Sequence, residues 1–306
     1  MRWIVTLAVT AAAASLAVAQ DKGPEATSLL GTPLHRGTPS PEALANLQSA
    51  HAALQKAPND ADAIIWVGRR LGYLQRFREA IAIYTRGISA HQNDPRMYRH
   101  RGHRYISIRE FDKAIADLGA AAKLVEGKPD EIEPDGQPNA RKIPTSTLNS
   151  NIYYHLGLAY YLKGDFENAL KAYRQCATFS KNPDMTVATS HWLYMTLRRL
   201  GRIEDAKKVL EPIDAGMDII ENASYHKLLL MYKAEREADG LLSSASADSL
   251  DGATIGYGVG NWHLYNGRSD RAIEIFRTIV NQSATQWPSF GYIAAEAELA
   301  RASKPK

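Results

Sequence analysis

The feature that most constrains this chain is a spaced set of four residues that returns after 34 positions. The first copy is Gly68, Phe77, Ala80 and Tyr84, and the second is Gly102, Phe111, Ala114 and Leu118. A period of this length is typical of two helices joined by a short turn and stacked many times. Because one such hairpin cannot bury its apolar face alone, the repeat predicts an array of packed helices.

The array continues through most of the chain. Alanines equivalent to Ala80 recur at Ala114, Ala169, Ala206 and Ala272. Their spacing predicts six repeats, at about 61–94, 95–125, 150–183, 187–220, 221–252 and 253–286, and the fifth departs most from the pattern. A helix begun by Ser40-Pro41 and a second one over 289–303 are expected to cover the two ends. Residues 41–303 are therefore expected to form one all-α solenoid.

The third repeat carries a specific resemblance. Its signature residues are Leu156, Gly157, Tyr160, Gly164, Asp165, Phe166, Ala169, Tyr173 and Cys176. This pattern resembles the tetratricopeptide repeat (TPR), and the chain is identified as an exported bacterial member of that family. The resemblance implies a right-handed superhelix with a concave surface lined by the first helix of every hairpin. It also implies a non-catalytic, protein-binding role.

The N-terminal residues have a different character. Arg2 precedes an apolar run from Trp3 to Val18, which closes with the small-residue pattern Ala17-Val18-Ala19. This order predicts a signal peptide over residues 1–19 and a protein that is periplasmic or secreted. An uncleaved membrane anchor is the alternative, and membrane association is expected only in that case. Residues 20–40 contain glycine and proline without helical periodicity and predict a flexible leader.

An insertion separates the second and third repeats. Residues 126–149 contain four prolines and several closely spaced acids, which are Glu126, Asp130, Glu131, Glu133 and Asp135. Such a proline density excludes a regular helix. Two interpretations stay open: a solvated loop, or a lid that lies against the concave wall and competes with a ligand.

The concave positions of the family, carried over repeat by repeat, predict a groove rich in cations, imidazoles and aromatic rings. Its one acid, Asp62, is expected to pair with Arg96. The candidate ligand- or partner-binding residues are Trp66, Arg69, Tyr73, Arg96, Arg99, His100, His103, Asn151, Tyr154, His155, Tyr161, His191, Trp192, Arg198, Tyr225, His226, Tyr257 and Asn261.

This composition favours an anionic ligand or an extended partner segment, because guanidinium groups pair with carboxylates and phosphates. Protonation of the imidazoles predicts tighter anion binding at pH 5.5 than at 7.5. The expected function is a non-catalytic protein-interaction scaffold of the cell envelope, whose partner is a protein or peptide, with acidic segments among the candidates. A net charge of +4 over 306 residues is too small to indicate nucleic acid.

Two other functions stay open. The histidines His100, His103, His155 and His191 lie at corresponding levels of successive repeats and would suit an enzyme or a metal-dependent accessory protein. A structural adaptor that uses its convex face is the third possibility. The chain carries no phosphate loop and no Gly-x-Ser-x-Gly or His-Glu-x-x-His motif, so we expect no catalytic residue, metal or cofactor.

Overall fold

Helical hairpins make up nearly all of the computed structural model, which describes residues 23–234, 237–246, 248–282 and 284–303. The predicted signal peptide lies outside these residues. The first helices of the hairpins are α2 (Ala61–Tyr73), α4 (Pro95–Ser107), α6 (Leu148–Lys163), α8 (Pro183–Arg199), α10 (Ala223–Tyr232) and α12 (Leu250–Tyr265). Their partners are α3 (Phe77–Ala90), α5 (Phe111–Val125), α7 (Phe166–Phe179), α9 (Ile203–Leu210), α11 (Ala238–Ser243) and α13 (Ser269–Gln282). The prediction of an all-α solenoid is confirmed.

Two further helices lie at the ends of the array. Helix α1 (Pro41–Lys56) packs on α2, and the Ser40 hydroxyl caps it by accepting the Ala43 amide. Helix α14 (Phe290–Ala302) packs on α12 and α13. The irregular fifth hairpin has a short second helix, and α11 packs against α12.

The glycines of the repeat signature permit close helix packing within each hairpin. A Cβ atom placed on Gly68 would lie 2.4 Å from the ring of Tyr84, and one placed on Gly102 would lie 2.7 Å from Leu118. Both large side chains are completely buried. The spacing of the signature therefore follows from a small residue on one helix facing a large one on the other.

The tight turns inside the hairpins require one residue with positive φ. Glycine occupies this position in three hairpins, as Gly164 (φ 85°), Gly201 (φ 71°) and Gly267 (φ 80°). Gln75 (φ 56°) and Arg109 (φ 68°) take the equivalent place in the first two hairpins. A left-handed conformation costs a non-glycine residue about 1 kcal/mol or more. Both side chains contact segments outside the repeats: Gln75 accepts the Gly37 amide and Arg109 pairs with Glu296.

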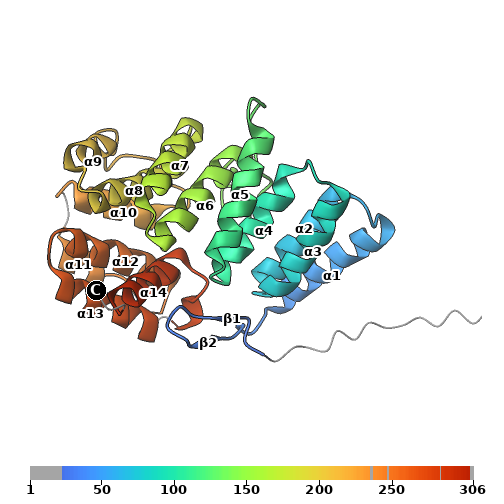
Figure 1. Ribbon diagram of the computed structural model, residues 1–306, viewed down its shortest axis with the longest axis horizontal. Coiled ribbons are helices and arrows are strands. Elements are labelled where there is room, and N and C mark those ends of the chain that lie inside the picture. The colour runs from blue at the N-terminus through green and yellow to red at the C-terminus, as the bar shows by residue number, and fades with distance from the viewer. Residues whose placement is uncertain (1–22, 235–236, 247, 283, 304–306) are drawn as a thin grey trace, which may run out of the picture.

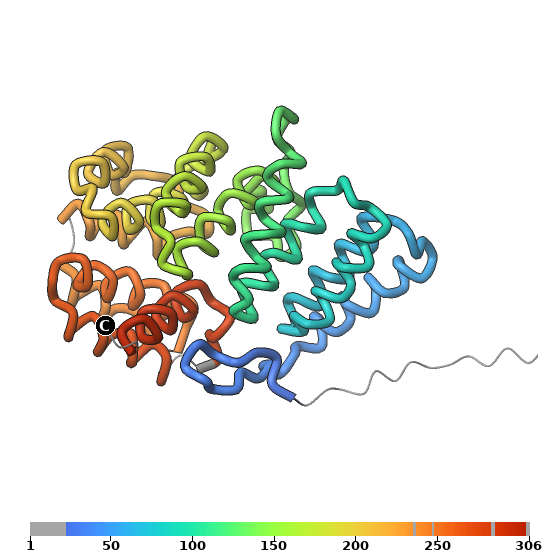
Figure 2. Tube along the Cα trace, in the orientation of Figure 1, coloured from blue at the N-terminus to red at the C-terminus, as the bar shows by residue number. Residues whose placement is uncertain are grey.

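The C-terminal part of the chain curls back toward the N-terminal part, as Figures 1 and 2 show. Helix α14 reaches α6 as well as its neighbours α12 and α13. Arg301 on α14 donates a hydrogen bond to the Leu162 carbonyl on α6 at 2.7 Å. The last helix thus fills the inner face of the array as well as covering its end.

The expectation of a flexible leader is wrong for residues 23–40. Strands β1 (Ala26–Thr27) and β2 (Pro33–Leu34) pair antiparallel and lie beside α14 in the tube trace (Figure 2). The Leu29 amide donates to Glu296, and the Trp287 indole donates to the His35 carbonyl at 2.8 Å. Long-range contacts of this kind have no periodic sequence pattern, so the sequence of residues 23–40 does not reveal their ordered structure.

A buried ion pair holds this closure together. Arg109 donates to both carboxylate oxygens of Glu296, at 3.1 and 2.7 Å, and to the Trp287 carbonyl at 3.0 Å. The side chains of Arg109 and Glu296 are almost fully buried. The ring of Trp287 packs edge-on against Phe77 with centroids 5.5 Å apart. The second hairpin, the strap formed by residues 23–40 and the segment that leads into α14 therefore meet in one cluster.

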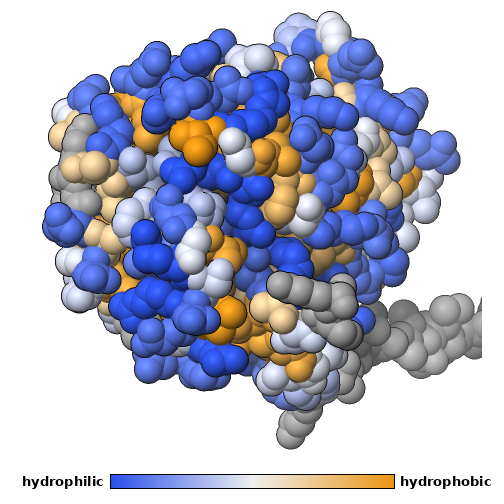
Figure 3. All heavy atoms as spheres, turned by 60° about the vertical axis from the view of Figure 1, so that its left-hand side comes forward, coloured by the Kyte–Doolittle hydropathy of each residue, from blue (hydrophilic) through white to orange (hydrophobic). Residues whose placement is uncertain are grey.

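On the face drawn in Figure 3, the hydrophobic residues form separate patches among hydrophilic ones. Among the helices of the described residues, none combines the length and apolar composition needed to cross a membrane. Cys176 is a free, buried thiol, and burial raises its pKa to about 11. This burial suits a packing role and disfavours a reactive one.

Candidate functional site

The insertion 126–149 lies across the inner face of the solenoid. Glu133 sits in this segment with an oxygen 3.0 Å from Nε of Arg99, and it accepts a hydrogen bond from Asn151 at 3.1 Å. Further along, the Gly136 carbonyl accepts from Arg70 at 3.0 Å. Residues 126–147 form no helix, as expected, whereas residues 148–149 already belong to α6. The interpretation as a freely solvated loop is wrong.

The insertion also contacts the opposite side of the molecule. Arg141 donates to both carboxylate oxygens of Asp218, at 2.7 and 2.9 Å. Asn139 donates to Glu221 at 3.0 Å. The insertion therefore connects the wall formed by the first repeats with the loop that precedes α10.

In the C-terminal half, the inner face is closed. Tyr161, Trp192, Tyr257 and Asn261 were expected to line an open groove, but all four are at most 1% exposed. The hydroxyl of Tyr257 donates to that of Tyr161 at 2.9 Å, and the Trp192 indole donates to Tyr154 at 2.8 Å. The reason is that α14 lies over this face. The concave positions carried over from the family correctly place these side chains on the inner face. They do not indicate that a further helix covers that face.

The cations of this closed half have partners. Arg199 on α8 donates to Glu298 on α14 at 2.5 Å and to Asn261 at 3.2 Å. Arg198 donates to the Tyr194 hydroxyl at 3.0 Å and to Asn266 at 2.8 Å. The acid that pairs with Arg199 thus comes from α14, which lies outside the repeats and was not among the concave positions.

The remaining sequence-predicted residues are spread over several environments. Arg96 pairs with Asp62 at 2.6 Å, as expected, and also with Asp94. The His226 ring contacts the Asp214 carbonyl at 2.8 Å. Trp66 lies under the guanidinium of Arg69, at 4.7 Å from the ring centroid.

Burial keeps the central imidazoles neutral. The pKa values of His100, His103 and His155 are lowered well below the usual range, first by desolvation and then by neighbouring arginines. Burial lowers the pKa of His191 to about 3. These four side chains therefore do not gain charge at pH 5.5, which removes the expected basis for tighter anion binding there.

The histidines also pack as a core. The rings of His103 and His155 lie 4.2 Å apart, and Phe290 at the start of α14 lies 5.5 and 5.6 Å from them. His191 stacks on Tyr225 with centroids 4.7 Å apart. Within the described residues, no group of three or more His, Cys, Asp or Glu side chains could hold a metal ion.

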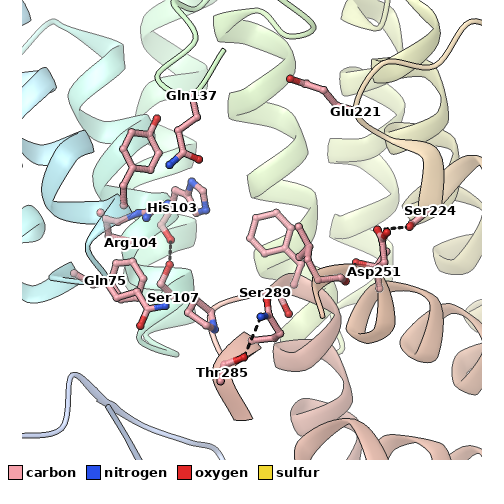
Figure 4. A pocket seen from close by; sticks show the side chains of 18 of the residues that line it. Gln75, His103, Arg104, Ser107, Gln137, Glu221, Ser224, Asp251, Thr285 and Ser289 are labelled. Atoms are coloured by element: carbon pink, nitrogen blue, oxygen red, sulfur yellow. Dashed lines mark hydrogen bonds between the residues drawn. The ribbon is translucent and has the colours of Figure 1, made fainter. Parts of the chain in front are cut away.

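An open pocket of about 600 Å³ remains between the two halves. Figure 4 shows Gln75, His103, Arg104, Ser107 and Gln137 on one side, and Glu221, Ser224 and Asp251 on the other. Ser289 and Thr285, from the segment before and at the start of α14, lie at the base in this view. Of the sequence-predicted site residues, Tyr73, His103 and Tyr225 line this pocket. One wall therefore carries a guanidinium group, and the other carries carboxylates.

Arg104 lines the pocket, although the concave positions carried over from the family do not include it. Its side chain reaches inward because Gly72 leaves room: a Cβ there would lie 2.8 Å from Nη1 of Arg104. Within the described residues Arg104 forms no ion pair with a carboxylate, and its guanidinium lies 5.1 Å from the centroid of the Phe77 ring. Burial, with help from Arg99 and Arg69, lowers its pKa to about 10, so it stays charged at neutral pH. The small residue at position 72 is the sequence signal that could have identified it.

Comparison with known families agrees with this architecture. A family model for the tetratricopeptide repeat matches residues 150–183. The chain therefore contains a tetratricopeptide repeat. This fold implies a scaffold for protein–protein interaction, and the family is generally non-catalytic.

Individual similarities are more distant. A member of the BBSome complex, BBS4 of Bos taurus, is 27% identical over 141 residues, or 46% of this chain. The match spans 23% of that curated relative, so this chain corresponds to about a quarter of its length.

Solved structures give looser matches. A TPR protein from Parabacteroides merdae aligns with 81% of this chain and 92% of its own, at 15% identity and a TM-score of 0.47. YrrB, a TPR protein with an unusual peptide-binding site, aligns with 77% of this chain and 92% of its own, at 14% identity and a TM-score of 0.45. Scores of this size do not bear on the function of this chain.

Proposed function

We propose that this TPR protein is a non-catalytic scaffold that holds a segment of a partner protein in the pocket between α2–α4 and α10–α12. The observation that carries the proposal is the charge of the two walls. Arg104 faces the pocket from α4 without a carboxylate partner in the described part of the chain, while Glu221 and Asp251 border it on the far side. A bound segment would place an anionic group against Arg104 and a donor or cation toward the acids.

The dimensions and polarity of the pocket support a segment rather than a whole domain. A volume of about 600 Å³ accommodates a few side chains, and Gln137 of the insertion and Phe290 of α14 are among the residues that line it. The lining combines Tyr73, Tyr225 and Phe290 with many hydrogen-bonding side chains. Aromatic contact area together with a few directed polar groups is typical of peptide anchors.

Site-directed photo-crosslinking in the native organism tests this function. A photoreactive phenylalanine analogue replaces Gln137, which lines the pocket, and a second variant carries it at Arg86, an exposed position on α3. We expect a discrete crosslinked partner from position 137 that is absent from position 86. Equal crosslinking at both positions, or none at 137, would overturn the pocket as the partner site.

We also propose that the protein acts in the cell envelope. The support is the sequence of residues 1–19, with its charged start, apolar centre and small-residue end. N-terminal sequencing of protein isolated from the native envelope fraction is expected to begin at Gln20. A chain that begins at Met1 in the cytoplasmic fraction would contradict export.

A further inference from the structure

We infer that Arg69, Arg99 and Arg104 form a binding site for a phosphate group, either a phosphate ester or inorganic phosphate. The inference rests on the proposed function and gives the anionic group of the ligand a chemical class. The three guanidinium groups come from two neighbouring first helices, α2 and α4.

A small cavity joins the three arginines. It has a volume of about 130 Å³, and Tyr73, Tyr84, His100 and Glu133 also line it. Gly72, Tyr73, His103 and Arg104 line both this cavity and the larger pocket. A group that enters the pocket can therefore reach the arginines without a path through the core.

The charge balance of the cavity favours a dianion. Three guanidinium groups face a single carboxylate, Glu133. The neighbouring His100, His103 and His155 are neutral because burial and the arginines lower their pKa values. The cavity therefore carries a net charge near +2 at neutral pH, by three positive charges less one negative. A phosphate ester carries about −1.5 to −2 at pH 7, whereas a second carboxylate would neutralise only half of the excess.

The hydrogen bonding of Arg99 points to a missing acceptor. This residue is 7% exposed, yet its Nε has no acceptor in good hydrogen-bonding geometry, although Glu133 Oε2 lies 3.0 Å away. Its Nη1 lies 3.0 Å from Nδ1 of His100, which is a neutral partner. A buried donor left without an acceptor is unfavourable, because its bond to water is lost and not replaced. A bound oxyanion with several oxygens would supply the acceptors that one carboxylate does not.

The other charged groups around the cavity do not cancel the excess. Arg70 on α2 donates to the Gly136 carbonyl and adds positive charge nearby. Glu221 and Asp251 border the larger pocket from the far wall and line no part of the small cavity. Glu133 is thus the internal counter-ion, and its position marks where the oxygens of a phosphate group would bind.

Calorimetric titration with two probes tests the site. The first probe is inorganic phosphate, and the second is a short phosphoserine peptide, with the unphosphorylated peptide as its control. We expect binding of inorganic phosphate, the phosphopeptide or both, and none of the unphosphorylated peptide. The phosphopeptide arm distinguishes a partner's phosphate from the free ion. Absence of binding by both phosphate probes would overturn the site.

Matched variants assign any binding to these residues. Arg104→Met is expected to weaken phosphate binding at least tenfold, and Glu133→Gln to strengthen it several-fold by removing the internal competitor. Arg86→Met removes the same charge from the outer face and is expected to leave the affinity unchanged. Far-ultraviolet circular dichroism checks that each variant is folded. Equal affinity in Arg104→Met and the wild type would contradict the assignment.

The pH dependence separates phosphate from a general charge effect. Affinity for the phosphoserine peptide is expected to fall as the pH drops below about 6, because its phosphate takes up a proton near its second pKa. The buried imidazoles do not compensate, since their pKa values are lowered. Tighter binding at pH 5.5 would contradict the inference. If phosphate does not bind while crosslinking at position 137 persists, this inference fails and the proposed function stands; the reverse result would reject the partner site alone.

Discussion

The inner faces of the two halves of this solenoid use equivalent repeat positions to different ends. In the C-terminal half, aromatic rings of α6, α8 and α12 are buried under α14, and Arg199 pairs with Glu298. In the N-terminal half, α2 and α4 present arginines to a pocket, and Arg104 has no carboxylate partner among the described residues. The repeat therefore determines which side chains point inward. Elements outside the repeat decide whether they become core or remain available to a ligand.

The largest expected effect is a difference in the free energy of unfolding between a variant of Arg109, which is paired, and a variant of Arg104, which has no carboxylate partner among the described residues. Arg109→Met leaves Glu296 buried without its cation and is expected to lower the free energy of unfolding by about 3–5 kcal/mol. Arg104→Met removes a charge that has no internal partner, so the expected change is within about 1 kcal/mol. Urea unfolding of both variants measures the difference. Equal losses would show that an arginine paired with α14 and one without a carboxylate partner do not differ in this way.

A second test concerns the packing of α14 on α12. A Cβ on Gly291 would lie 2.3 Å from the Ala253 carbonyl on α12, so Gly291→Ala is expected to destabilise by about 1–3 kcal/mol. Gly119 in α5 has nothing within 4 Å of such a Cβ. Gly119→Ala is therefore expected to stabilise by about 0.5–1 kcal/mol through lower backbone entropy. Thermal unfolding that gives the same sign for both would mean that α14 does not pack closely on α12.

The closed half also predicts a pH effect on stability. Burial lowers the pKa of His191 to about 3 in the folded protein, while the unfolded chain titrates near 6.5. Between these values the unfolded state binds a proton that the folded state does not, so stability falls as the pH falls below 6.5. From pH 7.5 to 5.5 this residue accounts for about 1.4 kcal/mol.

The variant His191→Phe keeps a ring between Tyr225 and Tyr232 and removes the titrating group. We expect it to lose about 1.4 kcal/mol less stability than the wild type between those two pH values. Urea unfolding at pH 7.5 and 5.5 measures this difference. Identical pH dependence in both proteins would indicate that His191 is accessible to protons in the folded state.

The smallest effect is expected on the outer rim of the open half. Asp62 is 69% exposed in its side chain, and its partner Arg96 keeps a second carboxylate, Asp94. Asp62→Asn is therefore expected to change the free energy of unfolding by less than about 1 kcal/mol. Added salt should reduce even this difference. A loss comparable to that of Arg109→Met would show that the rim is part of the closure.

Local sequence patterns were sufficient for the hairpins. The pairing of Gly68 with Tyr84 and the cap at Ser40 depend on neighbours within one repeat or one turn. The spacing of such residues therefore predicts helices and their packing. The ion pair between Asp62 and Arg96 joins equivalent positions of adjacent repeats, and it was predictable for the same reason.

The closure and the open pocket depend on contacts between distant parts of the chain. The strap of residues 23–40 and helix α14 meet Arg109, which is 187 residues from Glu296 in sequence. No period relates these segments, so sequence patterns alone do not place them. Arg109 does carry a local signal, because a non-glycine residue occupies a turn where the third, fourth and sixth hairpins use glycine. The sequence shows that Glu133 carries a negative charge, but it does not identify the residue that Glu133 contacts.

Crystals soaked in tungstate, a heavy analogue of phosphate, test the central difference between the two halves most directly. The account predicts one strong anomalous peak within hydrogen-bonding distance of Arg69, Arg99 and Arg104, and none under α14 along α6, α8 and α12. A peak beside Arg199, or an empty arginine cavity with the crystals otherwise unchanged, would contradict it.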